Sequence, residues 1–250
     1  ALTSSTTASN NTAVGRDAMR DTTTGTQNAS FGTAALYTNS TGTNNTAIGF
    51  QTLALSTTAS NNSALGFDAL KVNTTGHSNT AIGSAALDAN TTGSKGIAVG
   101  AYALSGNTTG ASNTAVGYSA LGTNSTGNYN VAMGQDALNA NTTASNNVSI
   151  GFRSMMVNTT GANNTALGFF ALNQNTTGDK NVAIGATALD ANTTGTNNTA
   201  LGYKVLTAAT TANNNTGLGY GALEGNTTAS NNTAVGHFAL SLNTTGTTNV

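Results

Sequence analysis

The pentapeptide Asn45-Thr46-Ala47-Ile48-Gly49 (NTAIG) carries the pattern that decides the fold. Close variants of it recur along the whole 250-residue chain, and its glycine returns at every seventeenth position without insertion or deletion. These glycines are Gly15, Gly32, Gly49, Gly66, Gly83, Gly100, Gly117, Gly134, Gly151, Gly168, Gly185, Gly202, Gly219 and Gly236. Helix-pair repeats need about 33 residues or more, whereas seventeen residues suit one coil of a solenoid. The pattern therefore predicts an all-β fold, a parallel β-solenoid (β-roll) of about fifteen coils.

Two apolar columns accompany the glycine. The residue before it, such as Ile48, is apolar in every repeat, and the residue four places after it, such as Leu53, is always Leu or Met. We expect these two columns to form the core. The residue two places before the glycine, such as Ala47, is always small, which predicts close packing against another layer or another chain. Because strand side chains alternate, Thr46 should share a face with Ile48.

Such a coil buries few large side chains, so its stability should come from many identical contacts between neighbours and from association with other chains. We expect residues 1–250 to form a single repetitive solenoid, a segment of a longer rod with no caps. The expected partners are copies of the same chain, in a homotrimer, an end-to-end filament or both.

Asparagine lies four residues before the glycine in every repeat except one, where Gly96 replaces it. Asn and Gly both tolerate left-handed backbone angles, and stacked Asn side chains can form an amide ladder. The column is therefore interpreted as a structural corner that needs no ligand.

A second recurring phrase is Asn73-Thr74-Thr75-Gly76 (NTTG). Its second Thr is present in all fifteen repeats, whereas its Asn is replaced by Ser5, Thr22, Ser56 and Ala209 in four of them. Stacked threonines give a structural reason for the phrase. The alternative is N-linked glycosylation on an exposed turn, since Asn-x-Ser/Thr is the acceptor signal. The candidate acceptors are Asn39, Asn73, Asn90, Asn107, Asn124, Asn141, Asn158, Asn175, Asn192, Asn226 and Asn243. Because Thr is kept where Asn is lost, the structural interpretation is favoured.

The composition argues against several classes of function. Seven basic and eight acidic residues are scattered along the chain, so there is no basic stripe for nucleic acid. No apolar run reaches the length of a membrane span, and the chain has no cysteine. His77 and His237 occupy different positions in distant repeats, and the carboxylates are isolated, so we expect no catalytic residues, no metal site and no cofactor apart from covalent glycans.

The position after the glycine varies and is often aromatic. It defines a candidate interaction surface of Phe50, Phe67, Tyr118, Phe152, Phe169, Tyr203 and Tyr220. The alternative is that these rings fill the groove between the subunits of a trimer.

The phrases NTAIG, NVAIG (Asn181 to Gly185) and NVAMG (Asn130 to Gly134) resemble the head repeats of trimeric autotransporter adhesins. This resemblance implies a left-handed, trimeric β-roll that is displayed on a bacterial surface and binds host or environmental surfaces. It covers the five-residue phrase in nearly every repeat, while the coil here is longer than the usual head repeat and adds the Leu column and NTTG. The match suits phage-fibre shafts and other extracellular fibrils equally well.

The functional expectation is a structural or adhesive fibre protein, extracellular or at the cell surface. Two alternatives stay open at this point. One is an ice-binding protein that uses a Thr ladder. The NTTG threonines lie beside a turn rather than in mid-strand, which argues against this alternative. The other is a viral tail-fibre shaft.

Overall fold

The computed structural model describes residues 2–250, which contain β-strands and no helix. The coils divide into two compact units, Ala1–Thr126 and Gly127–Val250. In the first unit the strands are β1 (Thr12–Val14), β2 (Ala29–Phe31), β3 (Thr46–Ile48), β4 (Ser63–Leu65), β5 (Thr80–Ile82), β6 (Ile97–Val99) and β7 (Thr114–Val116). In the second they are β8 (Val131–Met133), β9 (Val148–Ile150), β10 (Thr165–Leu167), β11 (Val182–Ile184), β12 (Thr199–Leu201), β13 (Thr216–Leu218) and β14 (Thr233–Val235).

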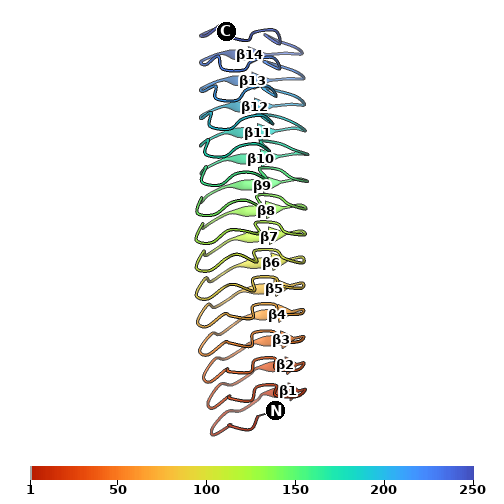
Figure 1. Cartoon of the computed structure of the whole chain (residues 1–250), viewed down its shortest axis with the longest axis vertical. Coiled ribbons are helices and arrows are strands. Elements are labelled where there is room, and N and C mark those ends of the chain that lie inside the picture. The colour runs from red at the N-terminus through yellow and green to blue at the C-terminus, as the bar shows by residue number, and fades with distance from the viewer. Residues whose placement is uncertain (1) are drawn as a thin grey trace. The chain divides into compact units, whose positions relative to one another are not determined.

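Within each unit every strand pairs in parallel with the next strand in the sequence, so that each repeat forms one coil (Figure 1). The register joins equivalent residues, as where Ala47 of β3 faces Ala64 of β4. Backbone hydrogen bonds also join consecutive coils outside the strands, for example from the amide of Leu53 to the carbonyl of Ala69 at 3.0 Å. The predicted parallel β-solenoid with seventeen-residue coils is confirmed.

The strands do not bury the column that was expected to be half of the core. In β3 the central Ala47 is fully buried, whereas Thr46 and Ile48 point outward, and 40% of the surface of Ile48 is exposed. Val14 and Leu65 are exposed to 55% and 45%. The assignment of the aliphatic column to the core is therefore wrong, because only the middle residue of a three-residue strand faces inward. The prediction that Thr46 and Ile48 share a face is confirmed.

The interior is built from small residues and one large side chain per coil. The Leu/Met column is buried from Met19 to Leu223, and so are most of the alanines in the middle of the strands. The small column thus packs closely against the opposite wall of the solenoid, which is the first of the two expected arrangements, and its burial does not require another chain. The pair of Gly217 and Val205 shows how narrow this space is. Gly217 is the one glycine in the middle of a described strand, and a Cβ at this position would overlap Cγ1 of Val205. Glycine therefore occurs where the facing side chain is larger than usual.

The backbone explains why the core column contains only Leu and Met. Every member from Leu2 to Leu240 has a left-handed backbone, with φ of 50° at Leu36 and 52° at Leu53. A branched Cβ is strongly disfavoured at such angles, whereas Leu and Met branch further from the backbone or not at all. The outward column has no such constraint and accepts Val and Ile freely.

The glycine after each strand is required for two reasons. Its φ lies between 121° and 145° along the chain, which other residues rarely adopt. A Cβ on Gly15 would also come within 2.5 Å of the carbonyl oxygen of Gly32 in the next coil. The seventeen-residue spacing of the glycines therefore records a corner where consecutive backbones nearly touch.

We expect Leu70→Ile to lower the free energy of unfolding by about 1–3 kcal/mol, since it conserves volume but places a branched Cβ at φ 51°. The matched control is Leu70→Met, which keeps an unbranched Cβ and should cost less than about 1.5 kcal/mol. Denaturant-induced unfolding followed by circular dichroism measures both. Equal midpoints for the two variants would contradict the backbone explanation.

Candidate functional site

The asparagine before each strand forms a buried ladder, here called the strand Asn ladder. Asn45 donates from its backbone amide to Oδ1 of Asn28 at 2.9 Å, and from Nδ2 to Oδ1 of Asn28 at 3.2 Å and the carbonyl of Ala59 at 2.8 Å. The left-handed residue at this corner is the preceding Asn44, with φ of 57°. The interpretation of the ladder residue as the left-handed one is therefore wrong, and hydrogen bonding explains its retention. At the single exception, Gly96 still donates from its backbone to Oδ1 of Asn79 at 2.8 Å.

The asparagine of NTTG forms a second buried ladder, here called the turn Asn ladder. Nδ2 of Asn90 donates to Oδ1 of Asn73 in the previous coil at 2.7 Å and to the carbonyl of Gly93 at 3.0 Å. Both hydrogens of the amide are thus used, one between coils and one within the turn. This arrangement repeats at Asn107, Asn158, Asn175 and Asn192.

Burial of the turn Asn ladder bears on the glycan acceptors. The predicted acceptors from Asn39 to Asn226 are no more than 1% exposed, and only Asn243 is partly exposed. The expectation that they lie on an exposed turn is wrong, because the side chains enter the coil and leave the threonines outside. A glycan on Nδ2 would replace one of its donors and would need space that the buried side chain does not have, so the placement of these residues argues against N-linked glycans on the folded coils.

The two threonines of NTTG have different roles. The hydroxyl of the first, such as Thr74, donates to the carbonyl of Thr91 in the next coil at 3.0 Å. The second, such as Thr75, is exposed in each of the fifteen repeats. Of the two threonines, the first therefore links consecutive coils through its hydroxyl, while the second remains on the surface.

The turn Asn ladder is interrupted where its asparagine is replaced. Oδ1 of Asn192 is buried without a hydrogen-bond partner, since the next coil has Ala209 at the equivalent position. Oδ1 of Asn39 and the hydroxyl of the next member, Ser56, are also buried without partners. These breaks leave buried polar atoms unsatisfied, which is destabilising.

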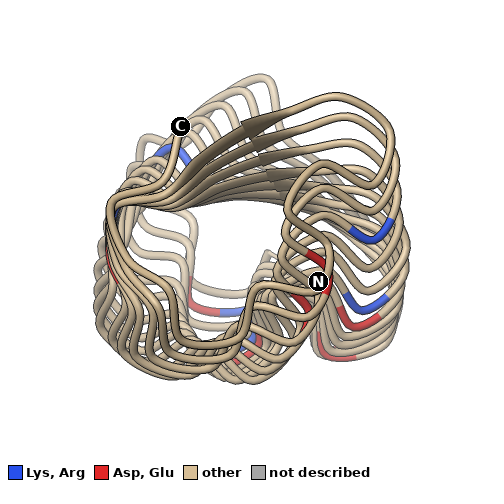
Figure 2. Ribbon diagram, turned by 90° about the horizontal axis from the view of Figure 1, so that it is seen from above, with Lys and Arg blue, Asp and Glu red and all other residues tan. Residues whose placement is uncertain are grey.

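The strands expose a neutral surface, here called the outward sheet face, composed of the first and third residue of each strand. It is rich in Thr, Val, Ile and Leu and contains no charged residue. Figure 2 shows the strand arrows free of charge colouring, with Lys, Arg, Asp and Glu confined to the loops that connect them.

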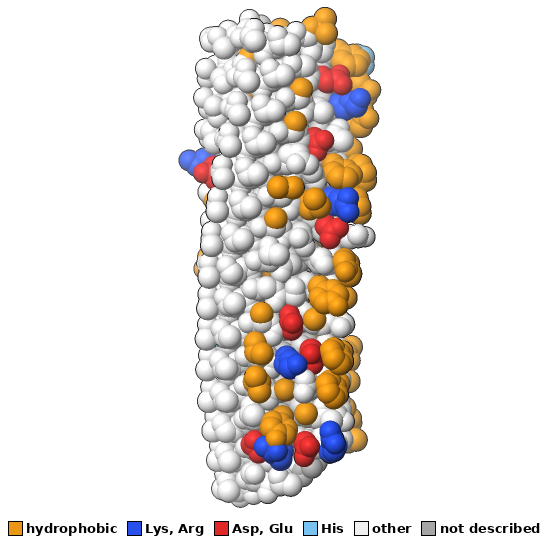
Figure 3. All heavy atoms as spheres, in the orientation of Figure 1, with side chains coloured by type: hydrophobic (Ala, Val, Ile, Leu, Met, Phe, Trp, Pro, Cys, Tyr) orange, Lys and Arg blue, Asp and Glu red, His pale blue; other side chains and the backbone are white. Residues whose placement is uncertain are grey.

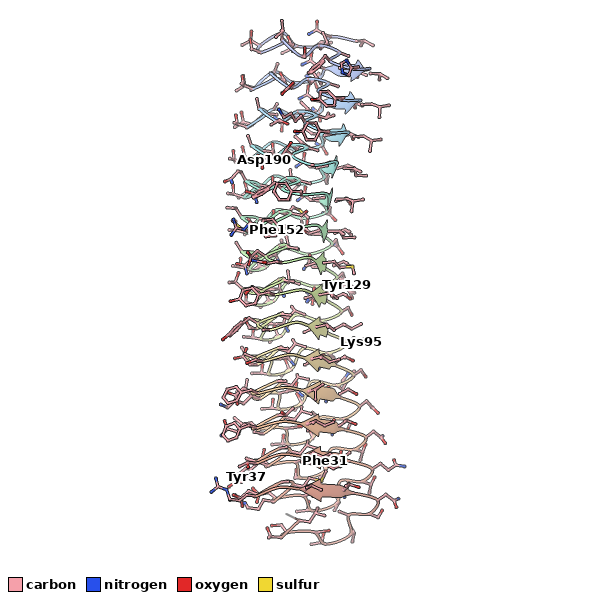
Figure 4. The ribbon with its side chains drawn as sticks, turned by 90° about the vertical axis from the view of Figure 1, so that its right-hand side faces the viewer. Phe31, Tyr37, Lys95, Tyr129, Phe152 and Asp190 are labelled. Carbon is pink, nitrogen blue, oxygen red and sulfur yellow. The ribbon has the colours of Figure 1, made fainter. Side chains whose placement is uncertain are left out.

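The two positions after the glycine form a different surface, here called the aromatic corner. The structure brings the predicted aromatic residues together in consecutive coils: Phe50 stacks on Phe67 with centroids 5.4 Å apart, and Phe152 on Phe169 at 5.6 Å. Within the second unit, Phe152 and Asp190 project from one edge of the coils and Tyr129 from the opposite edge (Figure 4). Of the predicted set, all but Phe152 have large exposed fractions, between 43% and 56%.

Sequence reasoning missed the second position of this corner. Tyr102, Phe170 and Phe238 lie there and make edge contacts with rings of the first position. The available signal was that this position also varies among the repeats.

Most charged side chains lie on the same variable turns and pair locally. Arg20 bonds Asp21 at 2.9 Å, and Lys71 bonds Asp68 at 3.1 Å. The hydrogen bond from Arg20 lowers the pKa of Asp21, while partial burial raises the pKa of Asp88 and of Asp190. Figure 3 shows orange, blue and red side chains gathered on part of the surface, beside broad white areas.

Among residues 2–250, no group of three His, Cys, Asp or Glu side chains is placed to hold a metal ion. The described part of the chain also has no helix long and apolar enough to cross a membrane. No family model, curated protein or solved structure matches the chain.

We expect Ala209→Asn to raise the free energy of unfolding by about 1 kcal/mol, because its Nδ2 would supply a donor for Oδ1 of Asn192. Ala208→Asn, next to it but partly exposed, is the control for the composition change. Thermal and denaturant unfolding would measure both, and a variant at 209 that is no more stable than the control would contradict a restored ladder.

Proposed function

We propose that the protein is structural, a repetitive fibre component whose copies associate through the outward sheet face. The observation that carries this proposal is the exposed aliphatic column. In the first unit it runs through all seven strands, and Ile48, Leu65 and Ile82 are exposed to 40–45%. The second unit repeats it, with Leu167, Leu201 and Leu218 exposed to 40–43%.

The size of this face supports an interface. Seven strands spaced about 4.8 Å apart and three residues wide give a face of roughly 30 by 10 Å in each unit. The largest contiguous apolar patch on a soluble monomer is typically about 300–600 Å² and is often functional, so a face of this size is large enough to be a contact surface. Because the face has no charged residue, a second copy with the same Thr and aliphatic columns could bury it without stranding a charge.

The assembly and location follow the resemblance of NTAIG to adhesin head repeats. It supports a homotrimer as the assembly and an extracellular or cell-surface fibre as the setting. The aromatic corner would then be the surface on which an adhesive activity depends, because it differs from coil to coil while the rest of the coil is nearly constant.

The test is the mass of the protein in solution, measured by sedimentation velocity for the wild type and for Ile48→Asp/Ile82→Asp. We expect the wild type to be a trimer and the variant to be a monomer with an unchanged circular dichroism spectrum, since two charges would lie in the apolar interface. The control Thr75→Asp/Thr92→Asp changes exposed residues of the turn edge and should stay trimeric. A monomeric wild type at micromolar concentration would contradict the proposal.

Ice binding is the second candidate, and one observation favours it. The objection that the NTTG threonines lie beside a turn does not apply to the outward sheet face, where Thr46, Thr80 and Thr114 occupy strands and repeat beside the aliphatic column. A flat, regular face of hydroxyl and methyl groups is suited to ordering water in a lattice.

Thermal hysteresis distinguishes the two functions. A monomeric wild type that depresses the freezing point without lowering the melting point, and loses this activity in Ile48→Asp/Ile82→Asp but not in Thr75→Asp/Thr92→Asp, would support ice binding through the sheet face. Absence of hysteresis in the wild type would eliminate this candidate.

A further inference from the structure

Tyr203 and Tyr220 occupy the same position of consecutive coils on the aromatic corner. Their ring centroids are 5.3 Å apart with an interplanar angle of 39°, and each residue is 44% exposed. Backbone hydrogen bonds between consecutive coils hold their main chains in place. One of them runs from the amide of Gly221 to the carbonyl of Tyr203 at 3.0 Å. The two phenols are therefore held side by side at a surface that solutes can reach.

Three rings lie close to Tyr220, and only that of Tyr203 is a phenol. Tyr220 contacts His237 at 5.2 Å and Phe238 at 5.1 Å, neither of which is a phenol, so Tyr203 is the one tyrosine within contact of it among the described residues. The ammonium group of Lys204 lies 5.6 Å from the centre of the Tyr203 ring.

The other tyrosines are arranged differently. Tyr102 and Tyr118 meet edge to face at 77° with centroids 5.8 Å apart. Tyr37 has the guanidinium of Arg20 over its ring at 3.8 Å. Tyr129 is 65% exposed and, as Figure 4 shows, projects from the opposite edge of the coils to Phe152.

We propose that Tyr203 and Tyr220 form a dityrosine cross-link between consecutive coils under one-electron oxidation, with hydrogen peroxide and a haem peroxidase as the oxidant. Each phenol loses one electron and one proton to give a phenoxyl radical. The radicals join through one ortho carbon each, and loss of the two ortho hydrogens as protons, with two protons returning to the phenolic oxygens, restores both rings. One carbon–carbon bond forms and two aromatic carbon–hydrogen bonds break. The peroxide is reduced to two water molecules by the two electrons and two protons that the pair releases.

The geometry makes coupling within one chain faster than coupling between chains. To couple, radicals on Tyr203 and Tyr220 need only a tilt of two neighbouring rings. A radical on Tyr129 has to meet a tyrosyl radical of another molecule. The product would be a covalent cross-link between two residues seventeen positions apart. This inference does not depend on self-association of the chain through its outward sheet face.

The test is peroxidase treatment of the dilute full chain, followed by proteolysis and tandem mass spectrometry. We expect peptides joined between Tyr203 and Tyr220, lighter by two hydrogen atoms than their sum, together with dityrosine fluorescence at the mass of a single chain. Tyr220→Phe should abolish this linked peptide, whereas Tyr102→Phe should leave it unchanged.

Denaturation supplies the second readout. In concentrated guanidinium the yield of the Tyr203–Tyr220 peptide should fall several-fold relative to all other dityrosine peptides, because the coil no longer holds the rings together. An equal yield in folded and unfolded chains, or a folded chain that gives only intermolecular links through Tyr129, would overturn the proposal.

Discussion

The structure depends on one constraint, the stacking of every residue on its counterpart seventeen positions away. Parallel pairing in register joins like residue to like, so a side chain that fits one coil must also tolerate a copy of itself directly above and below. Aliphatic and threonine side chains satisfy this condition by packing, and asparagine satisfies it because each amide has both a donor and an acceptor to offer along the stack. A charged side chain would meet its own charge, which explains why charged residues are few and lie where the repeats differ.

This constraint also gives the interior its unusual composition. A coil of seventeen residues encloses too little space for a conventional apolar core, and a typical coil contributes one Leu or Met, several small residues and two amides. The amides act as structural elements as much as Leu53 does, because those of the strand Asn ladder bond the coils on both sides and those of the turn Asn ladder bond their own turn and a neighbouring coil. Cooperativity therefore comes from contacts between nearest neighbours, as in other solenoids.

The sequence predicted the architecture well, because a strict period requires equivalent residues to repeat their environment. It was a poorer guide to which side of the backbone each column faces. Alternation relates Thr46, Ala47 and Ile48 to one another, but it does not say whether the small or the large members point inward, and hydrophobicity favoured the wrong choice. The deciding information was three-dimensional: Leu53, at a left-handed backbone position, and Ala47, in the middle of its strand, are both fully buried, whereas Thr46 and Ile48 are exposed.

The same limitation applied to the candidate surfaces. Asn90 satisfies the acceptor signal for glycans, but a signal of three residues contains nothing about the burial of its first side chain. The aromatic residues at the position after the glycine could be recognised because they vary, and variation among repeats marks the side chains that the stack does not constrain. Tyr102 and Phe170 were missed because aromatic residues are a minority in their column, at three of fourteen repeats, against seven of fourteen at the position after the glycine.

The strand Asn ladder has an evolutionary consequence. Each Asn bonds to the Asn of the coil before it, and to the Asn and the turn carbonyl of the repeat after it, so no coil depends on its absolute position in the chain. In-frame duplication or loss of one repeat during recombination would rejoin the same donors to the same acceptors. A gene of this kind can change the length of its product in single steps without passing through a misfolded intermediate, and new residues at the aromatic corner can then accumulate one coil at a time.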